Sequence, residues 1–119
     1  MILAIDHVQV AAPPGCEARA RAFYADALGL TEVPKPAEIA ARGGCWFESD
    51  AVRVHVGVEP EFRPARKAHT AFRVANLDAL VQRCRERGFS PTEIEARGGE
   101  RRSYVDDPFG NRIELIAVR

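Results

Sequence analysis

Two strand-like segments decide the fold: Ile5-Asp6-His7-Val8-Gln9-Val10 and Ala68-His69-Thr70-Ala71-Phe72-Arg73-Val74. Both are rich in the β-branched and aliphatic residues that strands favour. Each has a histidine near its start, and these two histidines are 62 residues apart. The same pattern therefore begins twice, which indicates an internal repeat.

The first repeat extends from this strand, predicted over residues 2–11, into an amphipathic helix over residues 16–28. Gly29 stands where a helix C-cap belongs. Three short strands are predicted next, at Leu30–Val33, Cys45–Glu48 and Val52–Val58. Residues 1–58 thus predict a βαβββ module.

The second repeat has the same order. Its strand at residues 68–74 precedes a helix that Asn76 begins as N-cap and Gly88 ends. Further strands are predicted at Phe89–Thr92, Arg102–Asp106 and Asn111–Ala117. Residues 59–67 hold two prolines and five charges, which favour an exposed connector. We therefore expect one α+β domain over residues 1–119, with modules at 1–58 and 68–119.

The repeat aligns four side chains with metal-binding chemistry. His55 and Glu114 lie in the last strands of the two modules, 59 residues apart, close to the offset between His7 and His69. Imidazoles and one carboxylate suit Zn²⁺, Ni²⁺, Fe²⁺, Co²⁺ or Mn²⁺, and two histidines with one carboxylate leave positions open for water and substrate. We expect a divalent metal at His7, His69 and Glu114, with His55 as a fourth ligand or a catalytic base. Each residue alone is also open to a structural role.

Aromatic and basic side chains near these positions are candidates for substrate contact. Trp46 or Phe47 and Tyr104 fall at similar places in the two modules, with sheet packing as the alternative. Arginines on the ligand-bearing strand faces can hold a carboxylate or lie at the outer edge in water. These are Arg53, Arg73 and Arg112.

Composition limits the other partners. Seventeen basic residues balance 17 acidic ones, which gives no reason to expect nucleic acid or an anionic membrane surface. Residues 1–5 are too short an apolar run for a membrane span. Three widely spaced cysteines without a C-x-x-C motif favour reduced thiols and a cytoplasmic location. They are Cys16, Cys45 and Cys84.

Four stretches carry a family resemblance: Ile5–Val10, Phe23-Tyr24 with Leu28-Gly29-Leu30, Ala68–Phe72 and Asp106–Leu115. In them the chain resembles the vicinal oxygen chelate superfamily, the group of glyoxalase I, bleomycin-resistance proteins and extradiol dioxygenases. The resemblance implies two βαβββ modules forming a cupped, barrel-like mixed sheet around a metal, with helices outside. It also implies that His7, His69 and Glu114 are the metal ligands and that His55 is the variable fourth position.

The resemblance favours a glyoxalase-like enzyme that acts on a small oxygenated substrate with the metal as Lewis acid. Glyoxalase I usually has Glu or Gln where this chain has His55, so lyase, isomerase, transferase and dioxygenase reactions all stay open. The alternatives are a small-molecule or antibiotic-binding protein without turnover and an interaction module with a structural metal. Under all three we expect a homodimer, with the modules pairing within one chain or across two.

Overall fold

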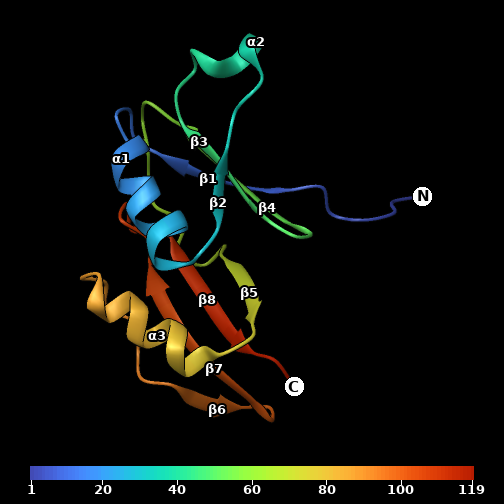
Figure 1. Ribbon diagram of the computed structural model, residues 1–119, viewed down its shortest axis with the longest axis vertical. Helices are drawn as coiled ribbons and strands as arrows, with labels where there is room; N and C mark the ends of the chain where they lie inside the picture. Colours follow the sequence, from blue (N-terminus) through green and yellow to red (C-terminus); the bar gives the residue numbers. More distant parts are fainter. The chain divides into compact units, whose positions relative to one another are not determined.

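The computed structural model describes residues 1–119. The chain divides into two compact units, Met1–Arg63 and Pro64–Arg119 (Figure 1). The boundary between them falls inside the connector expected at residues 59–67. Each unit contains its own four-stranded mixed sheet.

Unit 1 has the strand order β1-β4-β3-β2, in which β1 runs parallel to β4 and the other neighbours are antiparallel. A short α-helix continues into a π-helix after the first strand. The elements are β1 (Val8–Ala12), α1 (Glu17–Ala20), η1 (Arg21–Ala27), β2 (Thr31–Val33), α2 (Ala37–Ala40), β3 (Cys45–Ser49) and β4 (Val52–Val58).

The core of unit 1 lies between this helical segment and its sheet. Phe23 and Tyr24 on η1 are fully buried, and the Tyr24 ring centroid lies 5.7 Å from that of Phe47 on β3. Gly29 follows the segment with φ +84°, a left-handed conformation that glycine adopts without steric cost. The predicted helix end at Gly29 is therefore confirmed.

Unit 2 repeats the arrangement with the strand order β5-β8-β7-β6. Its helix begins at Asn76, whose side-chain Oδ1 accepts a hydrogen bond from the Ala79 N–H at 3.0 Å, as predicted for an N-cap. Leu77, Val81 and Cys84 are its buried residues. The elements are β5 (Thr70–Val74), α3 (Leu77–Glu86), β6 (Glu95–Arg97), β7 (Glu100–Asp106) and β8 (Arg112–Ala117).

The α+β class and the two βαβββ modules are confirmed, with two open four-stranded sheets and the added helix α2 in the connection between β2 and β3. The strand predicted at Phe89–Thr92 is wrong, because β6 begins at Glu95. Pro91 has no N–H to donate to a ladder. Thr92 contacts β7 there, where its N–H donates to the Tyr104 carbonyl at 2.8 Å, without forming a strand.

The first strand of each unit starts just after its histidine. The strand predicted over residues 2–11 is β1 at Val8–Ala12, and His7 directly precedes it. His69 precedes β5 in the same way. No helix of the chain has the length and apolar character needed to cross a membrane.

Candidate metal centre

The candidate ligands of unit 1 are His7, directly before β1, and His55 on β4. His55 on β4 pairs with Gln9 on β1 and with Trp46 on β3. Its ring is stacked between two others, with the His7 centroid at 4.0 Å and the Trp46 centroid at 3.9 Å. Only 7% of His55 is exposed. Unit 1 thus brings its two histidines into direct ring contact.

An acidic neighbour sets the orientation of the His7 ring. His7 Nδ1 lies 2.8 Å from Asp6 Oδ2, so Nδ1 donates and Nε2 keeps its lone pair. Arg53 Nη1 donates to the other Asp6 oxygen at 3.1 Å. The hydrogen bond from His7 and the charge of Arg53 lower the pKa of Asp6 below its usual value. A carboxylate behind a histidine in this way is a common support for a metal ligand.

The His55 side chain is favoured in its neutral form. Burial lowers the pKa of His55, and the adjacent His7 adds to the effect. A neutral imidazole is the form that coordinates a metal ion or accepts a proton. His55 is therefore suited to either role predicted for it.

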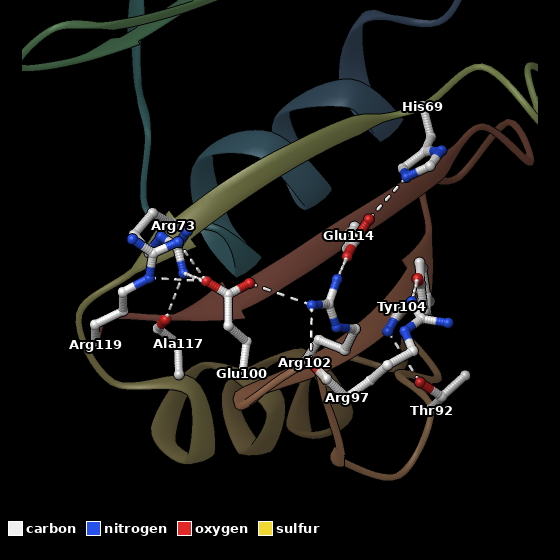
Figure 2. Close-up of polar contacts among 10 residues, drawn as sticks. All are labelled: His69, Arg73, Thr92, Arg97, Glu100, Arg102, Tyr104, Glu114, Ala117 and Arg119. Carbon is white, nitrogen blue, oxygen red and sulfur yellow. Dashed lines mark hydrogen bonds and ion pairs between the residues drawn. The ribbon is translucent and has the colours of Figure 1, made fainter.

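The candidate ligands of unit 2 form a hydrogen-bonded pair (Figure 2). Glu114 on β8 pairs with Ala71 on β5 and with Tyr104 on β7. Its Oε1 lies 2.8 Å from His69 Nε2, and only 6% of Glu114 is exposed. His69 Nδ1 lies 2.9 Å from the Lys67 carbonyl oxygen, which can only accept.

This contact fits a shared cation. Because Nδ1 donates its hydrogen to the carbonyl of Lys67, the Nε2 lone pair of a neutral His69 faces a carboxylate oxygen. A second proton on Nε2 or a divalent metal ion would satisfy both atoms. The donor types in unit 2 therefore fit a divalent metal, for which His69 Nε2 and Glu114 Oε1 would be ligands.

Glu114 is ionised despite its burial. Burial raises the pKa of this carboxyl, but the hydrogen bonds from His69 and Arg102 outweigh it, so the net pKa is lowered. Arg102 on β7 donates from Nη1 to Glu114 Oε2. Sequence analysis did not identify Arg102. The available signal was its place two residues before Tyr104, which puts both side chains on one face of β7.

The strand register gives the same equivalences as the sequence offsets. In both units, the residue two positions after the histidine that precedes the first strand pairs with the candidate ligand of the last strand. We call this candidate, His55 in unit 1 and Glu114 in unit 2, the corner residue. The β3 and β7 partners of these corners are Trp46 and Tyr104. Phe47, the alternative to Trp46, is fully buried in the core of unit 1. Trp46 is therefore the aromatic residue on the ligand-bearing face.

The three candidate arginines differ in their partners. Arg53 pairs with Asp6, and Arg73 donates to Glu100 and to the Ala117 carbonyl, both at 3.0 Å. Arg112 lies 4.1 Å above the Tyr104 ring, and its guanidinium has no carboxylate or carbonyl partner. It lines a cavity of about 550 Å³ in unit 2 with Arg66, Phe89, Ser90, Thr92, Tyr104 and Asp106.

Each unit supplies two of the four predicted ligands. His7 and His55 belong to unit 1, and His69 and Glu114 belong to unit 2. Within either unit, no three His, Cys, Asp or Glu side chains gather closely enough to hold a metal ion.

Comparison with known families decides the relationship. The family model of the Glyoxalase/Bleomycin resistance protein/Dioxygenase superfamily matches residues 4–115. The chain belongs to this superfamily. This result confirms the resemblance to the vicinal oxygen chelate superfamily that the sequence motifs indicated. No curated protein matches the chain.

Solved structures of the glyoxalase superfamily match over nearly the full length. A glyoxalase family protein from Bacillus anthracis is 48% identical, with 100% of this chain and 98% of that chain covered and a TM-score of 0.93. A genomically encoded fosfomycin resistance protein from Listeria monocytogenes is 16% identical, with 100% and 96% covered and a TM-score of 0.78. A glyoxalase family protein from Enterococcus faecalis is 15% identical, with 95% and 96% covered and a TM-score of 0.73. The last two show a shared fold.

Proposed function

We propose that this chain is a metal-dependent enzyme of the glyoxalase superfamily that acts on a small oxygenated substrate. The observation that carries the proposal is the contact between His69 Nε2 and Glu114 Oε1 at 2.8 Å, with His69 Nδ1 already bound to a carbonyl. These atoms have the chemistry of two ligands of one ion. Membership of the superfamily supports the same assignment.

The proposed ligands are His7, His69 and Glu114, with His55 as fourth ligand or base. Zn²⁺, Ni²⁺, Fe²⁺, Co²⁺ and Mn²⁺ all accept this donor set. When bound, such an ion supplies Lewis-acid polarisation of a substrate oxygen. Because each unit holds two of the residues, the active centre requires two units, within one chain or between the two chains of a homodimer.

His55 is the proposed proton acceptor when it is not a ligand. Its pKa is lowered mainly by burial, so the ring is neutral near pH 7 and has a lone pair available. Trp46 covers one face of the ring and His7 the other, so only its edge is open to a substrate. The protein thus holds the base in one orientation.

Arg112 is the best placed of the candidate substrate contacts. Its guanidinium lines the cavity of unit 2 without an acceptor and lies two residues from Glu114 on the same strand face. A guanidinium binds carboxylate or phosphate groups through two parallel hydrogen bonds. We propose that Arg112 and Tyr104 bind an anionic group of the substrate. Trp46, Arg53 and Arg73 are proposed to line the substrate-binding site.

Metal content tests the proposal. Wild-type protein purified without a histidine tag is compared with His69→Ala and Glu114→Ala after exposure to each of the five ions. We expect stoichiometric metal in the wild type and its loss in both variants, followed by turnover in screens of hemithioacetals, catechols and epoxide antibiotics. A folded wild type that takes up none of the ions would contradict the proposal and favour a binding protein.

The proposed setting is a homodimer in the cytoplasm. All three cysteines are buried and free, which supports a reducing compartment. Burial raises the pKa of the Cys45 thiol to about 11 and also raises those of Cys16 and Cys84. These thiols are core residues rather than nucleophiles.

A further inference from the structure

Arg102 is the closest charged neighbour of the candidate ligand Glu114. Its side chain is 14% exposed, and Nη1 donates to Glu114 Oε2 while Nη2 donates to Glu100 Oε2 at 3.2 Å (Figure 2). Its Nε is buried and has no hydrogen-bond partner. The guanidinium is therefore held by two carboxylates, one on each of its terminal nitrogens.

We propose that Arg102 is a positioning residue that acts through Glu114, fixing its orientation and lowering its affinity for a metal ion. This inference rests on the proposed function, because it requires that Glu114 binds a metal. Arg102 ties down Oε2 and leaves Oε1 facing His69 Nε2. Glu114 then offers one oxygen to the ion instead of two.

The charge of Arg102 opposes metal binding. A guanidinium stays protonated at every accessible pH, so it cannot relieve repulsion by losing a proton. A divalent ion on Oε1 and a guanidinium on Oε2 share one negative charge a few ångströms apart, in a site with little water. The same contact that orients Glu114 therefore weakens metal binding and leaves a bound ion more electron-poor.

The equivalent position of unit 1 lacks this cation. Two residues before Trp46, as Arg102 is before Tyr104, stands Gly44. Gly44 has φ +86°, and a Cβ there would lie 2.1 Å from the Val56 carbonyl oxygen, so no side chain fits. The corner residue of unit 1 is the neutral His55. A guanidinium at this place on the neighbouring strand thus occurs only in the unit whose corner residue is a carboxylate, and the nearby Arg53 of unit 1 pairs with Asp6.

Glu100 keeps Arg102 in place. This carboxylate is 18% exposed and also accepts from Arg73 and from Arg119, each at 3.0 Å. Hydrogen bonds from Arg119 and Arg73 lower the pKa of Glu100 and keep it ionised. Loss of the negative charge of Glu100 should direct the Arg102 guanidinium more strongly to Glu114.

Metal titration by calorimetry tests the inference. Co²⁺ and Zn²⁺ are titrated into wild type, Arg102→Met, Arg102→Lys and the control Arg101→Met. Arg101 points to the other face of β7 and pairs with Asp78 at 2.9 Å. We expect Arg102→Met to bind metal about tenfold more tightly. Arg102→Lys, which keeps the charge, and Arg101→Met should stay close to wild type.

A second variant covers the case in which Arg102→Met fails to fold. Glu100→Gln should bind metal about threefold more weakly than wild type, because Arg102 loses its other carboxylate. An unchanged or weaker affinity in folded Arg102→Met, or a tighter one in Glu100→Gln, would overturn the inference alone. Absence of metal binding in folded wild type and all variants would overturn the proposed function and the inference with it.

Discussion

The two units have the same βαβββ order and the same strand register around their corner residues, yet these residues have opposite surroundings. In unit 1, His55 is neutral and packed between two aromatic faces. In unit 2, Glu114 is ionised between His69 and Arg102. One backbone position thus accepts a stacked imidazole or an ionised carboxylate, depending on whether the neighbouring strand can supply a counter-charge.

The largest effect should come from removing the unit 2 carboxylate. Glu114→Ala leaves Arg102 in a largely buried place without its main partner, which costs about 3 kcal/mol of unfolding free energy. Urea denaturation of protein treated with a chelator measures this cost. The control is Glu32→Ala, which removes a partly exposed pair with Arg21 and should cost below about 1 kcal/mol. Equal losses of unfolding free energy in the two variants would refute the expected difference between the buried and the exposed ion pair.

Placing a carboxylate at the unit 1 corner should cost less but still be measurable. His55→Glu buries a charge where Gly44 offers no cation and Arg53 is already paired with Asp6, so we expect about 2 kcal/mol of lost stability near pH 7. Burial raises the pKa of such a carboxyl, so the loss should disappear as the pH falls below the ordinary glutamate pKa. His55→Gln is the neutral control. Identical pH profiles for the two variants would show that charge is not the cause.

A buried thiol in unit 1 should make stability depend on alkaline pH. The folded pKa of Cys45 is raised from 9.0 to about 11, so the unfolded state loses its proton first. Stability should fall as the pH rises from about 9 to about 11, by about 1 kcal/mol at pH 10. Denaturation curves of wild type and Cys45→Ala at pH 8 and pH 10 measure it. A loss of the same size in the variant would rule out Cys45 as the source.

The smallest predicted effect concerns the N-terminal ends of α1 and α3. Asn76 caps α3 with its side chain, whereas Cys16 before α1 makes no side-chain cap bond. Asn76→Ala should therefore lower the free energy of unfolding, measured by thermal denaturation, by about 0.7 kcal/mol. Asn76→Asp keeps an acceptor and should lose only a small part of this free energy. If Asn76→Ala and Asn76→Asp are equally stable, the cap bond adds nothing.

Much of the fold is readable from the sequence where local patterns are strong. Val52–Val58 forms a strand with the predicted bounds because its β-branched residues dominate the segment. Asn76 and Gly88 predict the α3 ends because capping and left-handed conformations depend on single residues. The strand expected at Phe89–Thr92 does not form, because pairing partners rather than local propensity decide where a short edge strand begins.

The candidate site is only partly readable. The repeat offsets give the equivalent positions of His7, His55, His69 and Glu114, which the strand register also shows. Arg102 is different, since Arg101 beside it is chemically identical, and only the register of β7 against β8 tells which side chain reaches Glu114. Strand alternation puts Arg102 on the face of Tyr104, but the contact with Glu114 depends on how two strands pair, which no pattern within one segment reveals.

We propose that His7 and His69 are both needed to bind the same metal ion. Co²⁺ titration followed by visible absorption measures the stoichiometry and affinity directly, in wild type, in His7→Ala of unit 1 and in His69→Ala of unit 2. We predict one tightly bound ion per chain in the wild type and loss of tight binding in each variant. Full stoichiometry and wild-type affinity in folded His7→Ala would contradict the claim.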